Sequence, residues 1–324
     1  MKKKLLLGVA LSALLLYLSV RGIDFQGVVA GFRTVRYGYA LLGVAAMLLM
    51  QVLRSFRWGL ILRPLAKIDQ WSLFSVSNVG FLAIIALPAR LGELARPYLI
   101  TKKSPLKMSS ALGTIFVERI LDMLTVLVIA AVLLFIIPLP PWLVQGAVLV
   151  FLVTLAMALL VILMIVKREA TLRILSPLIG RLPERYAEGF LRLIRHFLEG
   201  FRIMVDPRRL IATLALSIVI WLVDVYAIQM MLAAFDFQLP LAAPFVVMLI
   251  LVVGIAIPTA PGFIGNWHYF CILALGLYSV PKTDALSFAI VYHVLSIGVI
   301  ILLGLVSLPH NRFSISDIRR YSQN

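Results

Sequence analysis

Cysteine is almost absent from this sequence. Cys271 is the only one and lies within an apolar stretch, which excludes a disulfide framework and a cysteine-based metal site. Compact catalytic patterns are also missing, because there is no H-E-x-x-H, G-x-S-x-G, P-loop or G-x-G-x-x-G motif. We therefore expect no metal ion, no cofactor and no catalytic activity of the chain itself.

Acidic residues are scarce, with 14 Asp and Glu against 30 Lys and Arg. The formal net charge of +16 does not indicate nucleic acid as a partner, since a membrane protein reaches such a balance by lining its cytoplasmic loops with Lys and Arg. We expect no binding to nucleic acid.

Hydrophobic runs dominate what is present. The chain is 62% hydrophobic, above the roughly 45–50% of soluble domains, and its mean hydropathy is +1.06. Charges or Pro and Gly break the runs at intervals near 20 residues, about the length at which a helix crosses the hydrocarbon core. Runs such as LLGVAAMLLM (41–50) do not alternate as barrel strands do. The sequence predicts an all-α, polytopic transmembrane helical bundle.

Six runs predict simple spans, at 5–20, 39–62, 108–137, 142–166, 209–234 and 285–308. Two other apolar segments are interrupted: 71–87 runs into Pro88 and continues from Gly92 to 100, and 242–257 runs into Pro258 and continues from Gly265 to 277. Each predicts a re-entrant hairpin made of a helix, a break and a second helix. The alternative is an ordinary span that Pro and Gly kink.

Lys and Arg set the predicted orientation in the membrane. The start of the chain, the loops after 62 and 100, the 167–209 segment and the C-terminal tail are rich in them, which places both termini in the cytoplasm of a multi-pass cell membrane protein. Arg21, Arg33 and Arg36 fall on the outside, against this rule. The first hairpin then enters from the cytoplasm and the second from the opposite face.

The two halves are predicted to be inverted repeats. A shift of 170 residues carries 39–62 onto 209–232, Pro88 onto Pro258 and Gly92 onto Gly262. Interrupted segments at matching positions of inverted repeats point to a transporter's binding site. The predicted organisation is a single membrane domain with a first helix and loop (1–38), repeat 1 (39–137), a linking helix and cytoplasmic segment (138–208), repeat 2 (209–308) and a tail (309–324).

Within 167–208, apolar residues recur at helical spacing among arginines. The apolar residues are Phe190, Leu193, Ile194, Phe197, Leu198 and Phe201. This pattern predicts a basic amphipathic helix on the anionic inner leaflet, with a plain linker as the alternative.

Ionisable residues at membrane depth need a partner or a pathway, and the first group of them is Arg90, Glu93 and Arg96 at the first break. The arginines and the N-terminus of a restarting helix would suit a phosphate. The alternative is a self-neutralising cluster that only fixes the loop.

The second group is Glu118, Arg119 and Asp122. Glu118 and Asp122 are four apart and share one helix face, while Arg119 can pair with Asp122 three residues on. The two acids could hold a proton, a cation or the arginines. Arg54 and Arg57 end the second span, either in contact with substrate or paired with these acids.

The second half contributes its own candidates. Asp224 lies alone in a span and is either functional or a hydrogen-bond acceptor for a neighbouring helix. Gly262, Asn266 and His268 lie at the second break, and His293 follows on the last span. The histidines either shuttle protons or are packing residues.

Together these motifs resemble the lysylphosphatidylglycerol synthase transmembrane-region family, also called flippase-like or UPF0104 proteins. The motifs are R-x-x-R-W (54–58), P-x-R-x-G-E-x-x-R (88–96), E-R-x-x-D (118–122) and P-x-x-P-G-x-x-G (258–265). The resemblance runs to about residue 308 and implies a plasma-membrane protein related to the lipid-flipping half of bacterial aminoacyl-phosphatidylglycerol synthases. It covers the membrane part alone, so synthase activity is not expected to carry over.

Two positions depart from the family pattern. Phe263 stands where many members have a second Gly, and His268 where many have a Glu. If that Glu reads a cationic head group, the His argues against lysyl-phosphatidylglycerol as cargo.

We predict a lipid transporter that binds a phosphate-bearing lipid, either an anionic phospholipid or a polyprenyl phosphate. Arg90, Glu93, Arg96, Arg54, Arg57, Gly262, Asn266 and His268 are the expected head-group residues, and Glu118, Arg119, Asp122, Asp224 and His293 the coupling or pairing residues. A transporter of a small soluble anion, a lipid-modifying enzyme and a non-catalytic accessory subunit of one are the alternatives, and a homodimer is left open.

Overall fold

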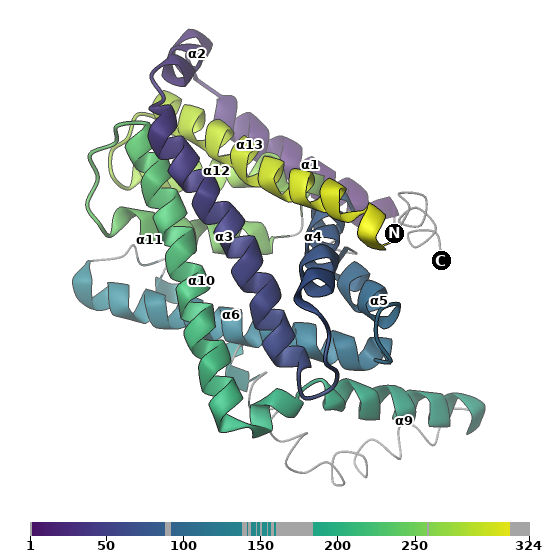
Figure 1. The fold of residues 1–324 in the computed structure, drawn as a ribbon. Helices are drawn as coiled ribbons and strands as arrows, with labels where there is room; N and C mark the ends of the chain where they lie inside the picture. Colours follow the sequence, from purple (N-terminus) through teal and green to yellow (C-terminus); the bar gives the residue numbers. More distant parts are fainter. Residues whose placement is uncertain are drawn as a thin grey trace. The chain divides into compact units, whose positions relative to one another are not determined.

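The computed structural model describes residues 2–87, 92–137, 184–257 and 259–311, with short helical pieces between 141 and 159. All regular structure in these ranges is helical, so the predicted all-α fold is confirmed. The helices in Figure 1 are α1 (Lys2–Val20), α2 (Phe25–Arg33), α3 (Tyr37–Leu62), α4 (Gln70–Ala86), α5 (Ala95–Thr101), α6 (Met108–Ile136), α9 (Glu184–Glu199), η2 (Arg202–Val205), α10 (Pro207–Ala234), α11 (Ala243–Ala256), η3 (Pro261–Phe263), α12 (Asn266–Gly276), α13 (Lys282–Ser307) and η4 (Pro309–Asn311).

The predicted simple spans match the long helices closely. In the described part of the chain, α3, α6, α10 and α13 are long and apolar enough to cross a membrane. A fifth span is reached if the pair α1 and α2, which is bent by 82°, is counted as one. The predicted span 142–166 lies mostly outside the described residues.

The second interrupted segment folds as a helix, a break and a second helix. α11 ends at Ala256 and α12 begins at Asn266, and the two helices pack against each other. A Cβ on Gly254 would lie 2.5 Å from the Phe270 ring, so the glycine permits this close packing. Between the helices, Gly262 and Gly265 have φ of 70° and 83°, a conformation that glycine adopts without strain. The predicted sequence of helix, break and second helix is seen here, whereas its re-entry into the membrane stays a prediction.

The first interrupted segment also folds back on itself. Pro88 and residues 89–91 lie outside the described residues, but the chain on either side of them is in contact. A Cβ on Gly92 would lie 2.2 Å from the backbone of Ala83 in α4, and one on Gly80 would lie 2.1 Å from the Arg96 side chain at the start of α5. Residues 92–96 therefore lie against α4 instead of continuing its direction.

The chain forms two compact units, which take segments from both predicted repeats. Unit 1 is drawn from 1–54, 74–96 and 220–324, and unit 2 from 55–73 and 97–219. The inverted relation of the repeats and the five-part division of the membrane domain stay predictions.

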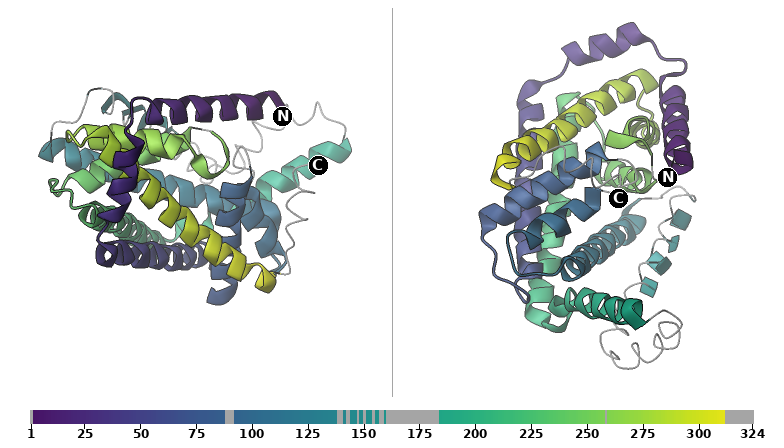
Figure 2. Two further views of the ribbon diagram at one scale, coloured as in Figure 1. Left: turned by 90° about the horizontal axis from the view of Figure 1, so that it is seen from above. Right: turned by 90° about the vertical axis from the view of Figure 1, so that its right-hand side faces the viewer.

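Unit 1 is held together by contacts of α1 with hairpin two and of α13 with α4. The Ala260 backbone N–H donates to the Ser12 hydroxyl over 2.8 Å, and a Cβ on Gly265 would lie 2.3 Å from the Ser12 carbonyl. α1 lies beside α12 (Figure 2). A Cβ on Gly304 of α13 would lie 2.6 Å from Leu82 of α4. α1 is therefore an integral part of this packing.

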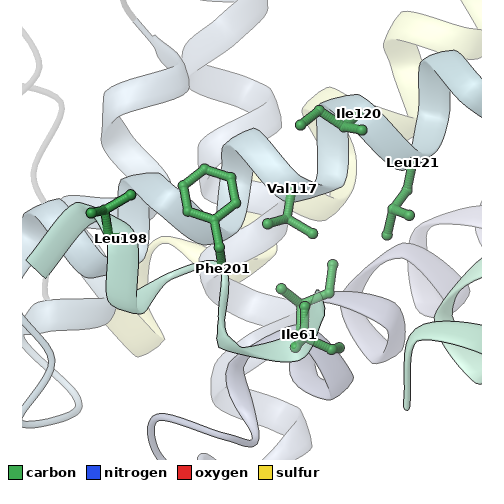
Figure 3. Packing of buried hydrophobic residues seen from close by; sticks show 7 residues of the cluster. Ile61, Val117, Ile120, Leu121, Leu198 and Phe201 are labelled. Carbon is green, nitrogen blue, oxygen red and sulfur yellow. The ribbon is translucent and has the colours of Figure 1, made fainter. Parts of the chain in front are cut away.

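Unit 2 has an apolar core formed by α3, α6, the last turn of α9 and the residues that follow α9 (Figure 3). Its buried residues are Ile61, Val117, Ile120, Leu121, Leu198, Phe201 and Ile203. Phe116, Phe197 and Phe201 add edge-to-face ring contacts with centroids 5.3 to 6.1 Å apart.

This core corrects the prediction for the amphipathic helix. The apolar stripe of α9 was assigned to the lipid surface, but Ile194, Phe197, Leu198 and Phe201 pack against α6 and α3. Helical periodicity shows only that one face of a helix is apolar. Such a face is stable against either lipid or protein. The apolar contacts of these four residues are therefore with protein, whereas the position of the helix relative to the inner leaflet stays a prediction.

The contact of α6 with α9 depends on Gly113 of α6, and Gly189 on α9 serves as its control. A Cβ on Gly113 would lie 2.3 Å from the Phe197 carbonyl oxygen, so we expect Gly113→Ala to cost about 1–3 kcal/mol by overpacking. Gly189 on α9 has nothing within 4 Å, so Gly189→Ala should stabilise by up to about 1 kcal/mol, because Ala is the better helix former. Thermal unfolding in detergent measures the stability of both variants. Equal changes of melting temperature in Gly113→Ala and Gly189→Ala would contradict the proposed contact.

Asp69 caps the start of α4 and gives a pH-dependent prediction. The Ser72 backbone N–H donates to its carboxylate over 2.8 Å, which holds the pKa of Asp69 below its usual range. A carboxyl with a lowered folded pKa stabilises the fold above its unfolded pKa, and the effect is lost as pH falls through the folded pKa. From about pH 5 to about pH 3, wild type should therefore lose more stability than Asp69→Asn, which caps without titrating. The melting temperature of each protein is measured across that pH range. If both melting temperatures fall by the same amount, this role of Asp69 is refuted.

Candidate functional site

Four ionisable residues of unit 2 form one cluster, which we call the ion cluster: Arg57 from α3 and Glu118, Arg119 and Asp122 from α6. Arg57 donates to Asp122, and its second nitrogen lies 3.6 Å from the Glu118 carboxylate. Arg119 lies 2.9 Å from Glu118 and 3.8 Å from Asp122. Two arginines thus face two acids, and the charges balance.

Burial makes the ion cluster a structural joint. The side chains of Arg57 and Glu118 are each 1% exposed, so neither charge has water to solvate it. Arg57 also donates to the Ser217 hydroxyl of α10 over 2.9 Å, and the neighbouring Trp58 indole donates to Thr114 of α6 over 3.1 Å. For Arg57 the geometry therefore supports pairing with the acids, one of the two alternatives that the sequence left open.

Arg54 and Arg96 of unit 1 have a different environment and are called the arginine pair. The Arg54 guanidinium lies 5.5 Å from the centre of the Phe81 ring, and that of Arg96 lies 5.3 Å from it. A cation within about 6 Å of an aromatic face is attracted by the ring quadrupole. Phe81 thus brings together two arginines that are 42 positions apart in the sequence.

Arg96 is the more deeply placed of the two. Its side chain is 2% exposed, and its aliphatic part lies where Gly80 leaves room on α4. Arg54 is partly buried, and its charge interacts with that of Asp224 on α10. Asp224 also interacts electrostatically with Tyr292 of α13. The carboxylate of α10 therefore lies in the field of an arginine and a phenol within unit 1.

The turn of hairpin two is fixed by side chains of α12 and α13. His293 donates through Nε2 to the Gly262 carbonyl over 2.9 Å, because a carbonyl only accepts. The Gly265 backbone N–H donates to Nδ1 of His268 over 3.4 Å. The two imidazole rings meet edge to face at 4.9 Å, and Trp267 stacks on His293 at 5.1 Å.

Asn266 satisfies the open end of α11. Its amide nitrogen donates to the Gly254 carbonyl over 2.7 Å, and lies 3.4 Å from the Ile257 carbonyl and 3.3 Å from the Thr259 hydroxyl. The Gly254 carbonyl also accepts from the Ile257 backbone N–H over 3.0 Å, and carbonyls at a helix end need such partners in an apolar interior. Asn266 is fully buried, and its role as seen here is to close the break.

Several buried polar atoms of unit 1 have no hydrogen-bond partner within the described residues, among them the indole N–H groups of Trp221 and Trp267 and the side-chain oxygen of Asn266. Trp221 lies one turn before Asp224 on α10, and Trp267 contacts Tyr292 at 5.1 Å between ring centroids. Buried polar groups are normally bonded, so these atoms mark a place where water or a ligand fits.

Comparison with known proteins places the chain in a family. Residues 5–304 match the family model described as the lysylphosphatidylglycerol synthase TM region. The chain belongs to this family. It is also similar to a UPF0104 membrane protein of Methanothermobacter thermautotrophicus, with 23% identity over 295 residues that cover 86% of this chain and 87% of the relative. No solved structure matches.

Membership of the lysylphosphatidylglycerol synthase TM region family confirms the resemblance drawn from the motifs and establishes an integral membrane protein.

The site residues fall into separate groups. Arg54 and Arg96 meet, as do Arg57, Glu118, Arg119 and Asp122, while Gly262, Asn266, His268 and His293 surround the second break. Glu93 is partly buried near the first break, and Arg90 lies outside the described residues.

Sequence reasoning missed Phe81 and Tyr292 as site residues. Phe81 is one apolar residue within an apolar run and has no distinguishing signal. Tyr292 precedes His293 on the last span, so a phenol beside an intramembrane histidine was a usable hint. The histidines act in the structure as hydrogen-bonding residues of the turn, and their proton-shuttle role stays a prediction.

The ion cluster gives a stability prediction. Arg57→Ala leaves buried acids uncompensated, and we expect a loss of about 3–5 kcal/mol, measured by thermal unfolding in detergent. Arg36→Ala removes an ion pair with Asp236 whose side chains are 55% and 52% exposed, so it should cost at most about 1 kcal/mol. Adding Glu118→Gln and Asp122→Asn to an Arg57→Met background should restore most of the loss. A small effect of Arg57→Ala alone would contradict the assignment.

Proposed function

We propose that this protein binds the phosphate-bearing head group of a membrane lipid in unit 1 and moves that lipid between the two leaflets. The observation that carries the proposal is the arginine pair, in which two guanidinium groups of unit 1 share the Phe81 ring and that of Arg96 is buried. Arginines at membrane depth are rare and mark substrate pathways more often than packing.

The chemistry of the arginine pair suits phosphate. A guanidinium group presents planar, parallel N–H donors that match two oxygens of a phosphate, and it stays charged at every physiological pH. Both guanidinium groups lie over the Phe81 ring, which brings their positive charges to one place in unit 1. Asp224 balances part of the positive charge while the site has no anion.

The hairpins supply the second line of support. Broken helices at the centre of a membrane protein expose backbone groups only where they line a cavity or contact protein, and they commonly form substrate sites. In unit 1 the buried indole N–H groups of Trp221 and Trp267 add unsatisfied donors near Asp224 and Tyr292. An anionic ligand would accept from these two donors.

The ion cluster is not part of the proposed head-group site. Its charges already balance, so we propose that Glu118, Arg119 and Asp122 hold Arg57, and through it the end of α3. Coupling of transport to protonation of Glu118 or Asp122 remains a prediction.

We also propose a plasma-membrane location with both termini cytoplasmic, on the strength of the Lys and Arg distribution.

The proposal predicts the effect of a conservative substitution at Arg96. Arg96→Lys keeps the positive charge but loses bidentate geometry, and the loss of a charged hydrogen bond corresponds to an approximately tenfold or larger fall in lipid translocation. The measurement follows fluorescent phosphatidylglycerol in reconstituted vesicles, with a membrane-impermeant reductant that bleaches the outer leaflet. Arg36→Lys, at an exposed ion pair, is the matched control and should translocate like wild type.

Two further arms separate the alternatives. Fluorescent diacylglycerol, which has the same chains without phosphate, should show no dependence on Arg96. Uptake of free phosphate by the same vesicles, sensitive to Arg96→Lys, would favour a transporter of a small soluble anion. Wild-type translocation at the protein-free rate would refute the proposed function.

A further inference from the structure

The short helix α2 lies almost perpendicular to α1. The bend between the two is 82°. α1 has 19 residues, so it is about 28 Å long, close to the thickness of the hydrocarbon core. The nine residues of α2 measure about 13 Å, but at this angle they advance only about 2 Å along the axis of α1. If α1 crosses the membrane, α2 lies in the plane of its surface.

One face of α2 is fixed to the start of α13. A Cβ on Gly31 would lie 2.8 Å from the Ser287 hydroxyl, and one on Gly27 would lie 3.0 Å from Thr283. The Ser287 hydroxyl lies 3.3 Å from the Val28 carbonyl, and Val28 is buried. The Asp24 side chain caps the helix by accepting from the Gln26 N–H. α2 is therefore a built element with a fixed orientation rather than a loose connection.

The remaining faces of α2 divide by polarity. Phe25 is 63% exposed and Val29 is 51% exposed, and at a spacing of four they lie on the same side. Gln26 and Ala30 are exposed on another side, and Arg33 lies between the two sides. An exposed aromatic and an aliphatic residue beside a polar edge are typical of a helix in the interface.

Positive charge surrounds this helix. Arg21 precedes it and Arg33 ends it, both exposed, and neither guanidinium makes an ion pair within the described residues. Arg36 by contrast is paired with Asp236 at 2.7 Å. The predicted orientation places Arg21 and Arg33 outside, so the positive-inside rule does not explain their presence. Binding to the phosphates of lipid head groups would explain it.

We propose that α2 is an interfacial helix that inserts Phe25 and Val29 into the membrane surface and binds anionic phospholipid head groups through Arg21 and Arg33. On the predicted orientation this surface is the outer leaflet. The site is separate from the arginine pair, so it is independent of the proposed transport function and holds whether or not the protein moves lipid.

Spin labels on single cysteines test the position of α2 in the membrane. In a Cys271→Ala background, labels at Phe25→Cys and Val29→Cys should favour oxygen over a water-soluble nickel complex as collision partner, several-fold more than labels at Gln26→Cys and Ala30→Cys. Positions 25 and 26 are adjacent in the chain, so a difference in accessibility between their labels reports which face of the helix is in the membrane. Equal accessibility at all four positions in vesicles would overturn the proposal.

A quenching experiment tests lipid preference. A fluorophore at Val29→Cys should be quenched more by nitroxide-labelled phosphatidylglycerol than by phosphatidylcholine with the same label. Each of Arg21→Gln and Arg33→Gln should lower the apparent preference for the anionic lipid by about fivefold, and salt should weaken it. Arg36→Gln, which loses a paired arginine, is the control and should leave the preference unchanged. Equal quenching by the two lipids in the unsubstituted background would refute binding of anionic head groups.

Discussion

The constraint on which this structure depends is the cost of removing guanidinium groups from water. A buried charge without a partner costs several kcal/mol, so each arginine in the interior must be compensated. Arg57 and Arg96 are 1% and 2% exposed. Arg57 and Arg54 lie on the same helix, three residues apart, yet they are compensated by different means. Their difference separates a structural joint from a candidate binding site.

Arg57 is compensated by full charges. Glu118, Asp122 and Ser217 surround its two terminal nitrogens, so an incoming anion would have to displace a carboxylate there. Arg54 and Arg96 both lie over the Phe81 ring, and the attraction of a ring for a cation is weaker than that of a carboxylate. The two arrangements thus differ in the contacts that surround their guanidinium groups.

Backbone groups at the breaks obey the same constraint. At the end of α11, Asn266 donates to the Gly254 carbonyl beside the backbone bond from Ile257, and it also reaches the Ile257 carbonyl. His293 does the same for the carbonyl of Gly262, whose positive φ turns the chain. The broken helix is thus tolerated because protein side chains, rather than lipid, surround it. Residues that looked like ligand or proton carriers in the sequence first serve to make the break possible.

The sequence by itself determined the helices, the breaks and the family, because hydrophobic length and Pro and Gly positions act locally and lipid leaves the backbone few alternatives. It also named the arginines and acids that matter, since charge in an apolar run is conspicuous. Only tertiary structure decided which charges meet: that Arg57 faces Glu118 while Arg54 faces Phe81, and that Phe197 and Phe201 cover α6 rather than lipid. Apolar surroundings look the same in sequence whether lipid or protein provides them, and a pairing between distant helices depends on packing that no local pattern encodes.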